Sequence, residues 1–335
     1  MSGLLINIFT NFLGTPRKTN SSKGQVAYDC PMCSSEKGIT GGDGKGNLEI
    51  NYEYGIFNCW ACGQRNNMKG RLPYLINRFG NKDLLKEYFL LRPETEYSEK
   101  EIKLISSLPK EFKPFTKPTN SLIYKQGIDY LHRRNIDNKL IERYNIGYIE
   151  EGTYEKRIII PSYGSNGEVN FFSNRSIETK TGYAISWPKY KNPEADKNVI
   201  IFNEKLISWN STIYLVEGAF DHIVVPNSIP LLGKTLSPYL MFMLYNYAKS
   251  NIVIFIDGDA YKDALEIYRE LNIGKLQGKI KMINTQGDYD ASSINQEFGK
   301  NGLLKVLRSA KRLNEQELWK NTIGKPLNNR IYIKK

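Results

Sequence analysis

Two apolar segments of the sequence each end in acidic residues. The segment "YLVEGAFDH" places Glu217 directly after an apolar run and Asp221 one helical turn later. The segment "IVIFIDGDA" ends in Asp257 and Asp259. Ligands of a parallel sheet bind beyond the carboxyl ends of its strands, so the two segments predict one shared site.

A third acidic segment, "GDYDASS", follows the strand-like run "KIKMIN" and adds two more carboxylates. Any one of these acids could be an ordinary helix cap or loop residue. Together they would repel one another, and such a cluster requires a compensating cation. Oxygen ligands favour Mg²⁺ or Mn²⁺, and two ions would suit phosphoryl transfer, with Glu217, Asp257 and Asp259 catalytic. The expected ligands are Glu217, Asp221, Asp257, Asp259, Asp288 and Asp290.

All four cysteines form two Cys-x-x-Cys pairs near the N-terminus, Cys30 with Cys33 and Cys59 with Cys62. Two such pairs can hold one tetrahedral Zn²⁺. The intervening "GNLEINYEYGIFNC" predicts a hairpin that leads into the second pair. We therefore expect a zinc ribbon with one structural zinc ion, whose binding supplies folding free energy.

Contact between the ribbon and DNA stays open at this point. Exposed aromatic rings can stack on bases while cations bind phosphates. The alternative is that half of the aromatic residues form the core of the ribbon. The candidates are Tyr52, Tyr54, Phe57, Trp60, Lys45, Arg65, Lys69 and Arg71.

The composition favours a polyanionic partner. The chain has 335 residues, 40% of them hydrophobic, and a formal net charge of +12. Such a charge suits phosphate neutralisation and hence nucleic acid. No apolar run is long enough to span a membrane. The N-terminal "LLINIFTNFLG" predicts a packing or partner-binding helix, not a signal peptide. We therefore expect a protein of the cytoplasm, or of the host cytoplasm if the protein is viral.

Other segments indicate how the chain is organised. Three prolines and three lysines in residues 108–120 predict a linker. "GIDYLHRRNIDNKLIERYNIGYI" predicts two short helices, and "KRIIIPSY", "GEVNFFSNRS" and "KNVIIFN" predict strands. From residue 212, short apolar runs alternate with amphipathic helices, which is typical of a parallel α/β layout.

The motifs "VEGAFD" and "IDGDA" resemble the Toprim signature, which primases, topoisomerases, recombination mediators and some nucleases share. The segments "YLHRRNIDNKLIERYNIGYI" and "RIIIPSYGSNGEVNFFSNRS" are similar to the catalytic core of DnaG-type primases. With the preceding ribbon, the chain looks most like primases of tailed bacteriophages that act with a separate helicase. One departure is that family members usually have a His among the zinc ligands.

The resemblance also implies residues that bind nucleic acid or NTPs. Arg157 and Arg175 match the basic positions of the strand pair, and "LGKTLS", which contains Lys234, resembles the "LGTALT" element. The segment "PKYKNPE" is similar to "KYLNSPE" of the family. It contributes Lys189, Tyr190, Lys191 and Asn192.

The resemblance implies a multidomain α+β protein. Its parts are a zinc ribbon, a mixed α/β basic subdomain, a Toprim domain with a parallel sheet and a short helical C-terminal segment. The expected boundaries are 1–70 for the ribbon with its extension, 71–125 for a helical and linker region, 126–210 for the basic subdomain, 211–295 for the Toprim domain and 296–335 for the helical tail.

The implied function is DNA-directed synthesis of short RNA primers for replication. The expected partners are a single-stranded DNA template, NTPs, the RNA primer–DNA hybrid, a separate hexameric replicative helicase and a single-strand binding protein; no membrane is expected. Two alternatives remain, a metal-dependent Toprim nuclease and a non-catalytic DNA clamp similar to recombination mediators.

Overall fold

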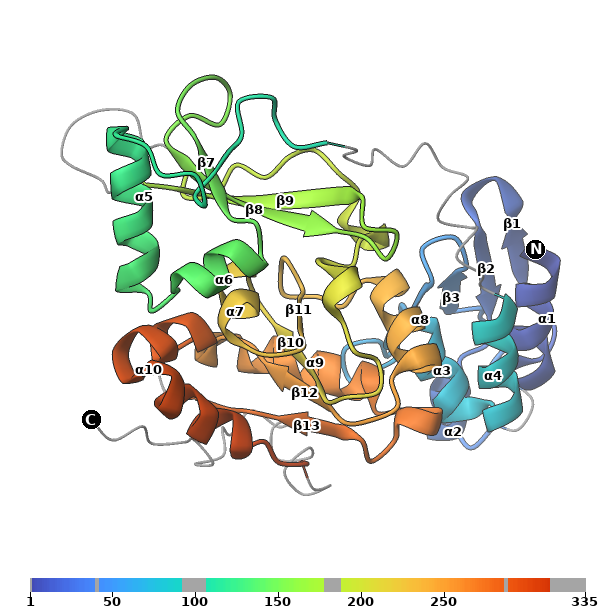
Figure 1. Ribbon diagram of the computed structural model, residues 1–335. Helices are drawn as coiled ribbons and strands as arrows, with labels where there is room; N and C mark the ends of the chain where they lie inside the picture. The colour runs from blue at the N-terminus through green and yellow to red at the C-terminus, as the bar shows by residue number, and fades with distance from the viewer. Residues whose placement is uncertain (1, 40–41, 92–106, 178–187, 286–288, 314–335) are drawn as a thin grey trace, which may run out of the picture. The chain divides into compact units, whose positions relative to one another are not determined.

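The computed structural model describes residues 2–39, 42–91, 107–177, 188–285 and 289–313 (Figure 1). These residues form two compact units. The first comprises residues 1–99 with 268–278, and the second comprises 100–267 with 279–335. In the described part, no helix combines the length and the apolar character that crossing a bilayer requires.

The first unit contains an antiparallel sheet whose five strands follow chain order. Strands β3 and β4 form the hairpin that the sequence predicts, with Leu48 opposite Cys59. Short helix α2 (Pro31–Glu36) begins directly after Cys30, with proline at a position that needs no backbone donor. The strands are β1 (Lys18–Asn20), β2 (Gln25–Tyr28), β3 (Leu48–Asn51), β4 (Ile56–Cys59) and β5 (Lys69–Arg71).

Three helices complete the first unit: α1 (Ser2–Leu13), α3 (Leu72–Phe79) and α4 (Lys82–Leu91). They pack against one another, and α1 buries Leu5, Ile8 and Phe9. The N-terminal segment is therefore a packing helix. Helices α3 and α4 belong with the ribbon, although the sequence suggested a separate region from residue 71.

The second unit contains two sheets. The first is antiparallel and runs β6 (Lys113–Pro114), β7 (Gly147–Ile149), β8 (Arg157–Tyr163), β9 (Val169–Ser176). Helices α5 (Leu122–Arg133) and α6 (Asn138–Arg143) are the predicted short pair. The linker prediction for 108–120 is wrong, because β6 pairs with β7 and Phe115 is buried among core residues.

The second sheet is parallel throughout, in the order β11-β10-β12-β13. Strand β12 reads "IVIF", and all four β-branched or aromatic residues are buried, as expected for a central parallel strand. Its strands are β10 (Ile213–Val216), β11 (Ser228–Pro230), β12 (Ile252–Phe255) and β13 (Ile280–Met282), and its helices are α7 (Ala219–Val224), α8 (Pro238–Tyr247), α9 (Tyr261–Leu271) and α10 (Ala291–Arg308).

Helix α10 packs on one face of the parallel sheet, where Val253 and Phe255 of β12 meet Val306 and Leu307. Residues 296–308 therefore belong with the parallel sheet instead of forming a separate tail, while 314–335 lie outside the described residues. The predicted strand at "KNVIIFN" is also absent. Its first part forms a short 3₁₀ turn, Lys197–Val199.

Candidate functional site

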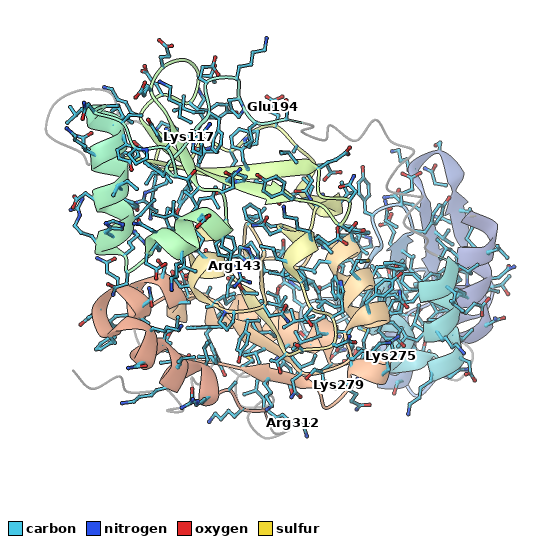
Figure 2. All side chains as sticks on the ribbon, in the orientation of Figure 1. Lys117, Arg143, Glu194, Lys275, Lys279 and Arg312 are labelled. Atoms are coloured by element: carbon cyan, nitrogen blue, oxygen red, sulfur yellow. The ribbon has the colours of Figure 1, made fainter. Side chains whose placement is uncertain are left out.

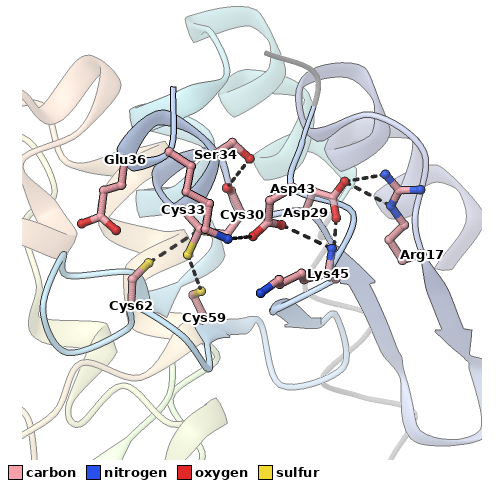
Figure 3. A network of polar contacts seen from close by, with 12 residues as sticks. Arg17, Asp29, Cys30, Cys33, Ser34, Glu36, Asp43, Lys45, Cys59 and Cys62 are labelled. Carbon is pink, nitrogen blue, oxygen red and sulfur yellow. Dashed lines mark hydrogen bonds and ion pairs between the residues drawn. The ribbon is translucent and has the colours of Figure 1, made fainter. Parts of the chain in front are cut away.

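The four cysteine sulfurs of the ribbon lie within 4.8 Å of one another, and all four residues are buried (Figure 3). The Sγ atoms of Cys30 and Cys62 are 3.6 Å apart, and those of Cys33 and Cys59 are 3.7 Å apart. A tetrahedral zinc ion with Zn–S bonds of ~2.3 Å requires S···S separations of about 3.8 Å. The cluster therefore fits one structural zinc ion.

Backbone turns shape each Cys-x-x-Cys pair. The amide of Ser34 donates to the carbonyl of Cys30, and the amide of Gly63 donates to the carbonyl of Cys59. A Cβ atom at Gly63 would lie 2.6 Å from the Cys59 carbonyl oxygen, so only glycine fits. Burial raises the pKa of the Cys33 thiol to about 12, and zinc must therefore displace protons when it binds.

Ion pairs stabilise the loop that connects the first Cys-x-x-Cys pair to β3. The guanidinium of Arg17 lies 2.7 Å from the carboxylate of Asp29 (Figure 3). The ammonium of Lys37 lies 2.9 Å from the carboxylate of Asp43. Asp29 also accepts a hydrogen bond from the amide of Gly46. These contacts hold the loop beside the cysteine cluster.

The ribbon aromatics divide into two groups. Tyr52 and Phe57 are buried, and the Phe57 ring stacks on Tyr74. Tyr54 and Trp60 are 62% and 73% exposed. Half of the aromatic candidates thus belong to the core, as the alternative interpretation suggested, and the other half remain accessible for stacking.

The acidic residues of the second unit approach one another at the carboxyl edge of the parallel sheet. Glu217 follows β10, Asp257 and Asp259 follow β12, and Asp290 caps helix α10. Burial and then the charges of Glu217, Asp290 and Asp259 raise the pKa of Asp257 to about 7. The structure therefore brings these four carboxylates together, while Asp288 lies outside the described residues.

Glu217, Asp257, Asp259 and Asp290, which we call the acidic rim, are less tightly grouped than the four cysteines. Among the described residues, only the cysteines place three or more ligand atoms within 4.8 Å of one another. The Asp259 carboxylate is 59% exposed and lies 3.9 Å from the ammonium of Lys234. Lys234 therefore reaches the acidic rim, where the resemblance placed an NTP-binding residue.

Glu217 has an oxygen that no group of the described residues satisfies. Its Oε2 atom is buried without a hydrogen-bond partner. Burial, opposed by Lys234, raises the pKa of its carboxyl. An unpaired buried carboxylate oxygen costs free energy, and a divalent cation held with Asp257 and Asp259 would remove that cost. The donors at this rim therefore fit a hard cation.

Asp221 has a different environment from the other acids. One oxygen accepts a hydrogen bond from the amide of Ser292 at 2.9 Å, and the other accepts from the amide of Gly218 at 3.1 Å. The residue is buried. Its carboxylate thus joins the start of α10 to the turn beside Glu217, and we propose that it organises the acidic site.

His222 follows Asp221 and is fully buried. Its Nδ1 atom lies 2.9 Å from the carbonyl oxygen of Ser228, and Nε2 lies 3.2 Å from the amide nitrogen of Asn203. Burial lowers its pKa to about 4, and nearby Arg143 on α6 (Figure 2) adds to this effect. Its hydrogen bonds thus connect the start of β11 to the segment that carries Asn203.

Three of the predicted nucleic-acid-binding residues form a group, which we call the basic platform: Arg175, Lys189 and Tyr190. The Arg175 guanidinium and the Lys189 ammonium lie 5.3 Å and 5.7 Å from the centre of the Tyr190 ring, which is 43% exposed. Desolvation and then the charge of Arg175 lower the pKa of Lys189, while Asp290 and Asp257 oppose this shift. The platform therefore lies beside the acidic rim.

Arg157 does not lie on a binding surface, so the prediction that it contacts phosphate is wrong. Its side chain is fully buried and donates to Asn174 and to the carbonyl of Pro188. Burial of the guanidinium lowers its pKa. The residue instead fastens the segment that carries Lys189 to β8 and β9.

Lys191 and Asn192 lie outside the basic platform. The Lys191 ammonium donates to the carbonyl of Thr153 and lies over the Tyr154 ring. The Oδ1 atom of Asn192 is buried without a hydrogen-bond partner.

Sequence reasoning missed Arg134 as a residue of this site. Its guanidinium lies 5.0 Å from the centre of the Tyr130 ring and 5.1 Å from that of Phe220, and it donates to the hydroxyl of Ser292. Its charge also lowers the pKa of Lys189. The dipeptide "RR" at the end of α5 was the only signal, and it does not distinguish Arg134 from exposed Arg133.

Comparison with known proteins agrees with this geometry. The chain is 24% identical to a DNA primase of Legionella pneumophila over 327 residues, covering 82% of this chain and 55% of the relative. It is 26% identical to the DNA primase of Enterobacteria phage T4 over 239 residues, covering 65% of this chain and 66% of the relative. The chain is thus similar in sequence to two DNA primases.

The fold agrees with that relationship. A solved DnaG catalytic core superposes with a TM-score of 0.50 at 19% identity, covering 62% of this chain and 78% of that chain. No family model matches the sequence. The chain spans about half to two thirds of the length of the primases that it matches in sequence, and it shares the fold of the DnaG core over the aligned part.

The cysteine cluster yields a first prediction. Cys33→Ser should abolish stoichiometric zinc and unfold the ribbon, because a small sheet depends on the metal for its stability. Metal analysis and circular dichroism of the full chain would measure both effects. Ser35→Ala, which changes a neighbouring residue outside the ligand set, should keep one zinc per chain. A folded, zinc-free Cys33→Ser ribbon would contradict the structural role.

A second prediction concerns Asp257 in metal-free protein. Its pKa is 3.8 when unfolded and about 7 when folded. The folded state therefore binds the proton more tightly, and this carboxyl reduces stability progressively as pH rises from about 4 to 7. Asp257→Asn should stabilise the protein at pH 8 by about 1–2 kcal/mol, a value discounted for partial exposure, and have little effect at pH 4.

Thermal unfolding with a chelator of Mg²⁺ would measure this difference. Asp129→Asn is a suitable control, because its carboxylate is 66% exposed in an ion pair with Arg133. Such a pair contributes little to stability. Equal melting temperatures of Asp257→Asn and the parent protein at pH 8 would show that the carboxylates do not repel one another as the structure indicates.

Proposed function

We propose that this chain is a DNA primase that synthesises short RNA primers on single-stranded DNA. The observation that carries the proposal is the buried, unpartnered oxygen of Glu217, surrounded by Asp257, Asp259 and Asp290 and adjacent to the basic platform. Carboxylates that require divalent cations, next to cations suited to phosphates, match nucleotidyl transfer.

Glu217, Asp257, Asp259 and Asp290 would hold one or two Mg²⁺ or Mn²⁺ ions, with Asp288 as a further candidate. When bound, the ions activate the attacking hydroxyl and neutralise the pyrophosphate leaving group. The protein holds the four carboxylates in place through β10, β12 and the N-terminus of α10. Partial burial at the rim strengthens their attraction for a cation.

The basic platform would bind the triphosphate and the nucleic acid. Arg175 can form two hydrogen bonds to a phosphate, while Lys189 acts as a point charge. The exposed Tyr190 ring offers a face on which a base can stack. The Lys234 ammonium lies 3.9 Å from the Asp259 carboxylate. It would exchange this acid for a phosphate when the nucleotide binds.

We expect the template to be single-stranded DNA and the substrates to be NTPs. The exposed rings of Tyr54 and Trp60 on the ribbon suit stacking against an unpaired template strand. A separate hexameric helicase and a single-strand binding protein remain proposed partners, as does the RNA primer–DNA hybrid. We also propose that the protein acts in the cytoplasm, because its proposed role is in DNA replication.

Primer synthesis itself is the third prediction. The full chain, incubated with single-stranded DNA, labelled NTPs and Mg²⁺, should give short RNA products on a gel. Glu217→Gln and Asp259→Asn should each reduce synthesis by at least about 100-fold. Each substitution removes a proposed ligand of the ions that would stabilise the charge of the transition state. Binding of single-stranded DNA, measured by fluorescence anisotropy, should stay within about twofold of the parent protein.

The same reactions separate the alternatives. Cleavage of plasmid DNA without RNA products would identify a nuclease. DNA binding that is unchanged in every acidic variant, without synthesis or cleavage by the parent protein, would identify a clamp. Asp129→Asn should synthesise primers at the parent rate, because its exposed ion pair on α5 is confined to that helix.

A further inference from the structure

The turn between α5 and α6 exchanges side-chain hydrogen bonds with helix α10. The amide nitrogen of Asn135 donates to the carbonyl oxygens of Asn295 at 2.7 Å and Gln296 at 3.2 Å. The amide nitrogen of Asn295 donates to the carbonyl oxygens of Arg134 at 3.0 Å and Asn135 at 3.3 Å. We call this reciprocal pair the asparagine clamp.

The backbone on both sides explains why asparagine suits this clamp. Asn135 has a φ of 55° in the left-handed region, which asparagine adopts more readily than most residues. Helix α10 is interrupted at Gly299, where φ is 65°. An interruption weakens the helical hydrogen bonds of the preceding turn, and the Asn135 amide supplies donors to the carbonyls there.

The clamp is connected to the acidic site through Arg134. The Arg134 guanidinium donates to the Ser292 hydroxyl at 3.0 Å. The Ser292 amide donates to Asp221, which also accepts from the Gly218 amide beside Glu217. The same end of α10 begins with Asp290 as its cap. The α5–α6 turn therefore touches the helix end that places one proposed metal ligand, and connects through Asp221 to another.

We infer that Arg134 and Asn135 are positioning residues that hold Asp290 in register with Glu217 and Asp257. Neither residue reaches the acids directly. Each fixes the start of α10 relative to the turn after β10, and so sets the spacing between carboxylates that no single strand determines. This inference rests on the proposed metal-dependent function, and it predicts that loosening the clamp weakens cation binding at the acidic rim.

Asn135→Gly tests the inference, because glycine keeps the left-handed backbone and removes only the amide. Asn145→Gly is a matched control: Asn145 has a φ of 48°, and its side chain donates to the hydroxyl of Tyr163 within the same subdomain. Both substitutions remove an asparagine amide from a left-handed position. Only the first removes contacts to α10.

Two measurements on the full chain are required, the affinity for Mn²⁺ from the spin-resonance signal of the free ion, and the Mg²⁺ dependence of primer synthesis. Asn135→Gly should weaken Mn²⁺ binding about fivefold to tenfold, equivalent to ~1–1.4 kcal/mol. The Mg²⁺ concentration for half-maximal synthesis should rise by a similar factor, with kcat at saturating Mg²⁺ nearly unchanged. Asn145→Gly should match the parent protein in both measurements.

Unchanged Mn²⁺ affinity in Asn135→Gly would overturn the inference, even where its melting temperature falls. If Asn135→Gly does not fold, Arg134→Gln carries the test, because it removes the guanidinium that donates to Ser292 and leaves the Asn135 side chain in place. Unchanged Mn²⁺ affinity would again overturn the inference. A parent protein that makes no primers, with Mn²⁺ binding still weakened by Asn135→Gly, would refute the proposed function and leave the positioning role intact.

Discussion

Mutual repulsion among carboxylates is the constraint on which this structure depends. Glu217 and Asp257 leave adjacent parallel strands at the same edge, and Asp290 joins them from the helix that follows the next strand. Their charges and their burial raise the pKa of Asp257 far above its usual range. Such an arrangement costs stability in the absence of a cation, and this cost is the reason for proposing that a divalent cation binds there.

The cysteine cluster and the acidic residues differ in geometry, as a structural zinc site and a proposed catalytic ion site would require. The cysteine cluster is buried and its sulfurs match the edges of one tetrahedron, which suits an ion that stabilises a small sheet. The acidic rim is open, and Asp259 is largely exposed. An open set of oxygens leaves coordination positions for substrate oxygens, as a catalytic ion requires.

The boundary between the two sheets of the second unit joins the basic platform to the acidic rim. Arg157 donates a hydrogen bond to the segment that carries Lys189, while Arg134 and the asparagine clamp hold the start of α10. Buried polar contacts thus hold both the segment of Lys189 and the helix end that carries Asp290. Such contacts are costly to leave unpaired, which makes the junction specific.

Local sequence patterns determined much of this protein. The spacing of the cysteines indicated the zinc cluster, and the apolar runs ending in Glu217 and Asp257 indicated parallel strands and their acidic edge. The resemblance of "RIIIPSYGSNGEVNFFSNRS" to a primase core indicated the paired strands. Each of these features is encoded by residues close together in the chain, where periodicity and spacing are visible.

Only the tertiary structure decided the rest. It buried Arg157, turned Asp221 toward two backbone amides and drew residues 108–120 into a sheet. It also brought Asn135 to Asn295, which is 160 positions further along the chain. The type of a polar residue does not reveal whether its side chain faces water, a ligand or a backbone group, because that depends on packing between segments distant in sequence.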